Sequence, residues 1–332
     1  MLTHSIITTM PTYTGISSNA FRHPLDLEAE QSLRNLPGFD LVTRKFVEFL
    51  YERPQFVFNM GNSIQVGPRQ YSTLYQMFRQ STHDLDIYPE PSLFVSQYPI
   101  SNAYALGQEQ PSIVLNSGLL DLMDQTELRS VIAHELGHIK CGHTTLNQMA
   151  IWAINTASFI GEMTLGLGNI IGSGLIFAFY EWKRKAELSA DRAALLVVDD
   201  LNAVMRGMMK LAGGSSKYAH ECSLEEFIRQ AERYQELDRE ELNQVYKFLL
   251  YNNLAQGIFL SHPFLVERIS HLRQWATSEE YRQIRNGNYK RAAAEGTVEV
   301  DASTPNSQVN DLRQQIEELQ QEIDRIKRSK SN

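Results

Sequence analysis

The chain has 332 residues, of which 42% are hydrophobic and 21% are charged, and its formal net charge at pH 7 is -8. This composition is typical of a folded globular protein and excludes the disordered, collagenous and disulfide-stapled classes. The negative charge repels phosphate backbones, so nucleic acid is not expected as a partner. Only two cysteines occur, and the first ten residues lack the pattern of a standard secretory signal. A cytoplasmic location is therefore expected.

The first third of the chain is expected to contain helices and then a small sheet. Residues 1–80 are interpreted as a helical segment that packs on a catalytic domain, with two short amphipathic helices within residues 25–53. Three segments rich in β-branched, aromatic and aliphatic residues follow, and they predict a small antiparallel or mixed sheet. Their ranges are Leu93–Gln97, Ala103–Leu106 and Ser112–Leu115.

A helix is expected to begin shortly after this sheet. Asp124 and, three residues later, Glu127 form a capping box, and the apolar residues that follow recur at helical spacing up to Ile139. The second half of the chain shows further helical patterns, at residues 181–198, 201–211, 223–234 and 240–251. The fold class is therefore expected to be α+β, mostly α.

The expected helix contains an H-E-x-x-H motif formed by His134, Glu135 and His138. Histidines four residues apart project from the same face of a helix and can bind one metal ion together. A catalytic zinc takes three protein ligands and leaves one position for water. The motif therefore predicts a zinc site that needs one more ligand from elsewhere in the chain.

Glu187 is the strongest candidate for the third ligand, because a second helix can place its carboxylate on the open side of the metal. Asp191 lies one turn later on the same face, where it can accept a hydrogen bond from the ring N–H of a ligating histidine. His143 follows His138 by five residues and points to another side of the helix, so it is expected to face solvent or pack on a neighbour. One Zn2+ per subunit is therefore expected, bound by His134, His138 and Glu187.

The order of these motifs resembles that of the HtpX and CAAX-prenyl-protease group of gluzincin metallopeptidases, peptidase family forty-eight. The resemblance rests on H-E-x-x-H at residues 134–138, on Glu187-x-x-x-Asp191 and on Ser-His-Pro at residues 261–263. It covers about residues 93–272. It implies a zincin-like metallopeptidase with a small sheet beside the active-site helix, zinc as the cofactor and the motif glutamate as the general base.

The chemistry of the motif agrees with that role for Glu135. Zinc lowers the pKa of its bound water, and a carboxylate on the same helix can take the water proton and pass it to the leaving amine. His262 is expected to stabilise the oxyanion, although its Ser-His-Pro sequence fits a structural turn equally well. Arg268 could donate to a carboxylate or to the oxyanion, but a surface position is more common for arginine.

Asn102, Ala103 and Tyr104 lie on one of the expected strands and resemble the family's Asn-Ala segment, which offers a sheet edge to substrate. A plain core strand is the alternative. The predicted function is that of a zinc-dependent metalloendopeptidase that hydrolyses peptide bonds in unfolded, damaged or membrane-associated proteins. The alternative function is a non-proteolytic chaperone or scaffold that uses the same groove.

The domain organisation is expected to comprise a zinc metallopeptidase domain at residues 81–285, a polar linker at 286–305 and a short coiled-coil or amphipathic helix at 306–332. Self-association through that C-terminal helix is expected. Residues 149–180 are the most apolar part of the chain, but glycines and polar residues interrupt them. They predict a peripheral membrane contact through a hydrophobic hairpin, with an integral span as the alternative.

Overall fold

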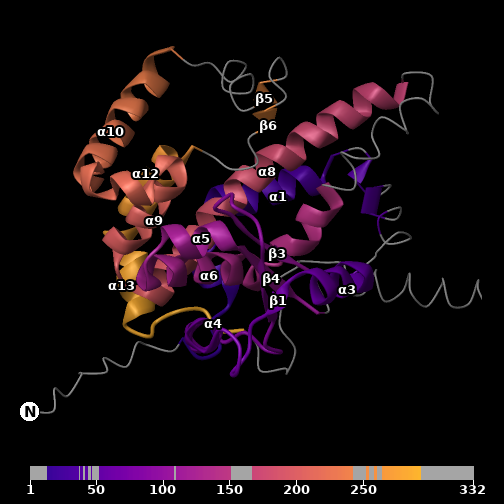
Figure 1. Cartoon of the computed structure of the whole chain (residues 1–332). Coiled ribbons are helices and arrows are strands. Elements are labelled where there is room, and N and C mark those ends of the chain that lie inside the picture. The colour runs from indigo at the N-terminus through magenta and orange to yellow at the C-terminus, as the bar shows by residue number, and fades with distance from the viewer. Residues whose placement is uncertain are drawn as a thin grey trace, which may run out of the picture.

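Helices dominate the computed structural model, and a small sheet lies beside the helix that carries the H-E-x-x-H motif (Figure 1). The expected class, α+β and mostly α, is confirmed. The structure describes residues 13–36, 38–39, 42–43, 46, 52–107, 110–150, 167–241, 252–253, 258–259 and 264–292.

The sheet has four strands in the order β1-β2-β4-β3. β2 pairs with β4 in parallel, and the other two pairings are antiparallel, so the sheet is mixed. The three predicted strands are confirmed to within one residue. β1 was not predicted, because its two residues are both exposed and show no apolar alternation. The strands are β1 Ile64–Gln65, β2 Ser92–Ser96, β3 Ala103–Leu106 and β4 Ser112–Asn116.

The active-site helix is α6 (Gln125–Lys140), and it begins at the predicted capping box. Asp124 accepts hydrogen bonds from the backbone N–H groups of Thr126 and Glu127, both at 2.9 Å, and the Glu127 carboxylate accepts from the Asp124 N–H at 2.9 Å. This reciprocal arrangement satisfies N–H groups that the first helical turn leaves without partners. The position of the motif along α6 is therefore determined locally.

The remaining described helices pack on α6, on its neighbours or on the sheet (Figure 1). α6 packs along the long helix α8 and contacts α4, α9 and the sheet. These helices are α1 Pro24–Arg34, α3 Glu52–Asn62, α4 Ser72–Asp84, α5 Ser117–Leu122, α8 Leu167–Val198, α9 Leu201–Gly213, α10 Leu224–Glu241, α12 Leu265–Ala276 and α13 Glu279–Arg285. A two-stranded ladder is formed by β5 Asn252–Asn253 and β6 Ile258–Phe259.

Gly137 sets the distance between α6 and α8. A Cβ atom at this position would lie 2.7 Å from the Cβ atom of Ala193 and 3.1 Å from the Cα atom of Ala190. These contacts are with the backbone and the shortest side chains of α8, which cannot rotate out of the way. The glycine inside the H-E-x-x-H motif therefore allows the two helices that carry the site to approach closely.

We expect Gly137→Ala to destabilise the fold by about 1–3 kcal/mol, because the added methyl group must push α8 away from α6. Zinc affinity should fall with it, since His134 and Glu187 lie on the two separated helices. Urea denaturation and a zinc titration measure the two effects. Gly61→Ala is the control: a Cβ atom there meets nothing within 4 Å, and alanine should stabilise α3 slightly. Equal effects of both variants would contradict this account.

The N-terminal helix α1 lies alongside α8 (Figure 1). A cluster of buried apolar side chains, which includes Leu33 of α1 and Phe179 and Trp182 of α8, joins the two helices. Residues 286–292, the first part of the expected linker, also contact the N-terminal region: the Ser17 N–H donates to the Lys290 carbonyl at 3.0 Å. The rest of that linker and residues 306–332 lie outside the described residues.

The expected apolar hairpin at residues 149–180 is described at both of its ends, and α8 begins within it at Leu167. Within the described residues, no helix is both long and apolar enough to cross a bilayer.

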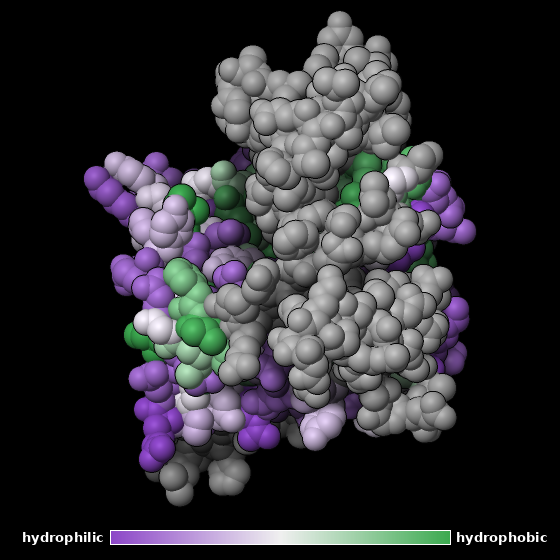
Figure 2. All heavy atoms as spheres, turned by 90° about the vertical axis from the view of Figure 1, so that its right-hand side faces the viewer, coloured by the Kyte–Doolittle hydropathy of each residue, from purple (hydrophilic) through white to green (hydrophobic). Residues whose placement is uncertain are grey.

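Helix α3 exposes three apolar side chains, Val57, Phe58 and Met60, each by roughly half. Figure 2 shows a hydrophobic area within a largely hydrophilic described surface.

Candidate active site

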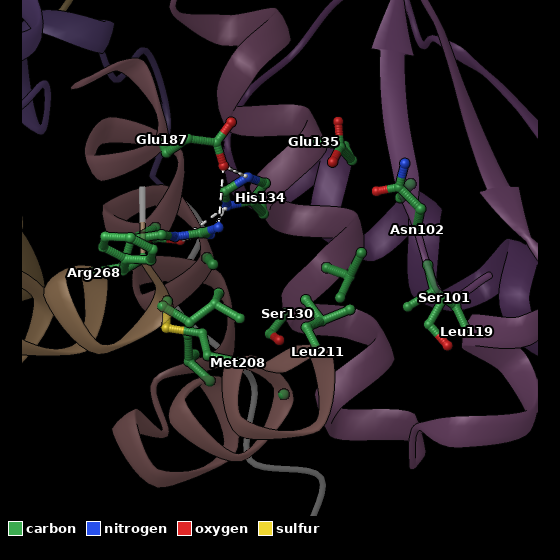
Figure 3. A pocket seen from close by; sticks show the side chains of 18 residues that line it. Ser101, Asn102, Leu119, Ser130, His134, Glu135, Glu187, Met208, Leu211 and Arg268 are labelled. Carbon is green, nitrogen blue, oxygen red and sulfur yellow. Dashed lines mark hydrogen bonds and ion pairs between the residues drawn. The ribbon is translucent and has the colours of Figure 1, made fainter. Parts of the chain in front are cut away.

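His134, His138 and Glu187 converge where α6 meets α8; Figure 3 shows His134 and Glu187 facing one another. One possible ligand atom from each residue lies within 4.8 Å of the other two. The two histidine Nε2 atoms are 3.2 Å apart, and the Glu187 oxygens lie 3.2 Å from Nε2 of His134 and 3.4 Å from Nε2 of His138. Two imidazole nitrogens and one carboxylate are a donor set that suits zinc.

The two histidines differ in their electrostatics. Burial lowers the pKa of His134, but hydrogen bonds to Asp191 and Glu187 outweigh this effect and raise the pKa to about 9. Burial dominates at His138 and lowers its pKa to about 4, since Glu187 compensates only in part. At neutral pH, His138 therefore offers a lone pair to a metal directly, whereas a metal must displace a proton from His134.

Asp191 and Arg268 lie behind His134. Asp191 of α8 is 3.0 Å from the Nδ1 atom of His134. Arg268 of α12 donates to both Asp191 oxygens, at 2.8 and 2.5 Å, and lies 3.2 Å from a Glu187 oxygen. Burial raises the pKa of Asp191, but Arg268 and His134 hold it below its usual value. Arg268 is only 6% exposed, which differs from the surface position that the sequence favoured.

We expect Arg268→Met to destabilise the fold by about 3–5 kcal/mol, because the carboxylates of Asp191 and Glu187 would stay buried without their cation. Arg273→Met on the same helix is the control. Its ion pair with Glu232 is about half exposed, so its loss should cost less than about 1 kcal/mol. Urea denaturation of both variants measures the difference. Equal losses would show that Arg268 does not compensate the buried charges.

His143 was expected to face solvent or to pack on a neighbour, and the structure shows the second of these. It is 2% exposed, its ring packs edge-on against Trp182, and its Nδ1 atom lies 3.0 Å from the Nδ1 atom of His138. Its Nε2 atom is 3.1 Å from a carboxylate oxygen of Asp26 in α1. Sequence analysis did not find Asp26, because no motif connects it to residues more than a hundred positions away.

A cavity of about 370 Å³ opens beside this cluster (Figure 3). Glu135 lines it and lies between His134 and Asn102, which directly precedes β3. Ser101, Asn102 and Ala103 form the sheet side of the cavity, whereas Tyr104 does not line it and is 36% exposed. The rest of the lining is mostly apolar and includes Val131, Val204, Met208, Leu211, Phe264 and Leu265. The cavity can therefore accept an extended chain with an apolar side chain.

β3 is positioned to offer an edge to that chain. It pairs with β4 on one side only, as far as the described strands go. Next to β3, the Asn102 carbonyl accepts a hydrogen bond from the Asn116 N–H at 3.0 Å. His262, which the sequence placed at the oxyanion, lies outside the described residues.

This chain is similar to known proteins over most of its length. A model of peptidase family M48 matches residues 68–276. The chain is 33% identical over 295 residues, 86% of its own length and 80% of the relative's, to the plastoglobule-localized metallopeptidase 48, chloroplastic, of Arabidopsis thaliana. It is 23% identical over 262 residues to a protease HtpX homolog of Moorella thermoacetica, covering 71% of this chain and 83% of the relative. The match includes strands β2 to β4 and both helices on which the three candidate metal ligands lie, and the chain therefore belongs to the zinc metallopeptidases of family M48.

Proposed function

We propose that His134, His138 and Glu187 bind the zinc of this peptidase and that Glu135 is its general base. The observation that carries the proposal is the convergence of the three donor groups at one buried point beside an open cavity. Zinc bound there supplies Lewis acidity, which lowers the pKa of a water molecule and polarises the scissile carbonyl.

Glu135 follows His134 directly on α6, so its side chain leaves the helix in a different direction from the two histidines and faces the cavity. In the proposed reaction its carboxylate takes one proton from the attacking water. It then delivers that proton to the amine nitrogen of the leaving peptide as the C–N bond breaks. His262 stays our prediction for the group that stabilises the oxyanion.

We propose an extended, unfolded or damaged polypeptide as the substrate. The edge of β3 that no described strand covers can pair with it through main-chain hydrogen bonds, with Asn102, Ala103 and Tyr104 as the binding segment. The apolar cavity wall favours a large aliphatic or aromatic side chain next to the cleaved bond. A folded protein exposes few such segments, because its apolar residues are buried and its strands are paired.

The test compares an unfolded protein such as casein with a compact folded protein of similar size, each incubated with the zinc-loaded chain. We expect the unfolded protein to be cleaved, the folded one to resist, and a chelator to stop cleavage. Mass spectrometry of the products should show large apolar residues beside the cleaved bonds. If the zinc-loaded chain binds casein without cleaving it, the chaperone or scaffold function would be supported instead; membership of a peptidase family favours cleavage.

We also propose a peripheral membrane contact through residues 149–180 and self-association through residues 306–332. The apolar composition of residues 149–180 supports the first. Separately, α3 exposes Val57, Phe58 and Met60, which are side chains of the kind that enter a lipid interface. The full chain should then float with lipid vesicles in a density gradient. Sedimentation with and without residues 306–332 should show a loss of the oligomer upon truncation.

A further inference from the structure

The chain turns sharply between His138 and His143, and this turn brings the two rings together. α6 ends at Lys140, with Cys141 as its C-cap. Gly142 follows with φ of +71°, the left-handed conformation that commonly ends a helix. Because α6 ends before residue 143, His143 does not occupy the position that a continuous helix would give it. Its ring contacts that of His138 instead.

One assignment of protons satisfies the hydrogen bonds of both His138 and His143, and it runs from His138 through His143 to Asp26. Nε2 of His138 faces His134 and Glu187. If that nitrogen carries the lone pair for a metal, Nδ1 of His138 must carry the proton. It then donates to Nδ1 of His143 at 3.0 Å, and the remaining N–H of His143, on Nε2, donates to Asp26 at 3.1 Å. Every donor in this chain of contacts meets an acceptor.

Asp26 is the last acceptor in this series of hydrogen bonds, and other side chains hold it in place. It is fully buried, and one of its oxygens accepts hydrogen bonds from Arg22 at 3.0 Å and from Ser189 at 2.6 Å, in addition to the contact with His143. Burial raises the pKa of the Asp26 carboxyl, but His143 and Arg22 outweigh this effect and hold the pKa well below its usual range. Ser189 lies in α8, two residues after Glu187, so Asp26 is tied to the ligand helix as well.

We propose that Asp26 and His143 form a positioning relay that orients His138 for zinc. The proposal rests on the ligand set proposed above. His134 has a direct carboxylate partner in Asp191, and the relay gives His138 the same kind of support through an intervening imidazole. Asp26 lies in α1, outside the 68–276 match to the family model. The N-terminal helix is therefore part of the metal site and not only a packing element.

The test is zinc affinity of the full chain, measured by competition with a chromophoric chelator, together with the visible spectrum of the Co2+-loaded chain. His143→Phe keeps a ring beside Trp182 but removes both nitrogens, and it should raise the zinc Kd by about 10–100-fold. His143→Asn keeps an acceptor near the Nδ1 position, so it should recover part of that loss. Asp26→Asn keeps the shape of the end point and removes its charge, and it should raise the Kd by roughly 3–10-fold.

Glu30→Gln is the matched control. Glu30 is a second buried carboxylate of α1 and pairs with Arg22 at 2.6 Å, but it has no contact with His143. We expect its zinc Kd and its Co2+ spectrum to equal those of the unmodified chain, whereas the His143 variants should show a changed Co2+ spectrum. Circular dichroism of the metal-free variants checks that each one is folded.

Two results would overturn the relay. Unchanged zinc affinity in folded Asp26→Asn and His143→Phe would show that the contacts do not act on His138. An equal loss in Glu30→Gln would show that α1 supports the site by packing alone. These results differ from those expected if His134, His138 and Glu187 are not the ligands. In that case the unmodified chain itself would bind neither zinc nor Co2+ at this site.

Discussion

Replacement of Glu135 by Gln is expected to lower kcat/KM for cleavage of an unfolded protein by about 10²–10⁴-fold, with the zinc content unchanged. Gln has the size of Glu but cannot accept a proton from the attacking water. Glu135 lies on α6 beside the ligands and lines the cavity without being one of the three converging donors. Catalysis and metal binding should therefore separate in this variant.

Glu135→Asp is a second variant, which tests whether a carboxylate at a slightly different position can still act as the base. Its carboxylate can still accept a proton, but the shorter side chain retreats from the cavity, so activity should lie between those of the unmodified chain and Glu135→Gln. Atomic absorption gives the zinc content and a fluorogenic casein gives kcat/KM. If Glu135→Gln keeps more than about a tenth of the activity while fully loaded with zinc, another group is the base.

Helix starts, the residues that share one helix face and the short strands could be predicted from the sequence. The capping box at Asp124 determines where α6 begins, and helical periodicity then places His134 and His138 on one face. The spacing of Glu187 and Asp191 similarly places both on one face of α8. Such features depend on neighbours within one or two turns, and the three β-rich segments were found for the same reason.

Features that depend on contacts between distant segments could not be predicted in the same way. The burial of Arg268 follows from the packing of α12 against α8, and the parallel pairing of β2 with β4 follows from the path of the chain between them. Gly142, which directly follows the C-cap Cys141, is a common helix stop and could have indicated where α6 ends. It would have placed His143 beyond the helix end, although not beside Asp26.

Zinc should stabilise the fold strongly, and Glu187 should account for much of this effect. A ligand present at 1,000 times its Kd stabilises the native state by about 4 kcal/mol if it does not bind the unfolded chain. For a chain of 332 residues, whose unfolding entropy is about 2.1 cal/mol/K per residue, that free energy corresponds to a rise in Tm of about 6 °C. Zinc removal by a chelator should therefore lower the Tm of the unmodified chain by a comparable amount.

Glu187→Gln should lose most of this zinc-dependent shift. The amide has the same shape but lacks the negative charge that faces His134, His138 and Arg268. Zinc would then meet two neutral nitrogens beside a guanidinium whose remaining carboxylate partner is Asp191. Glu181→Gln is the control on the same helix, since Glu181 is partly exposed and pairs with Arg184 and Lys185. Its shift should match that of the unmodified chain. A full shift in Glu187→Gln would require the third ligand to come from another residue, because a neutral amide is a poor replacement for a zinc carboxylate.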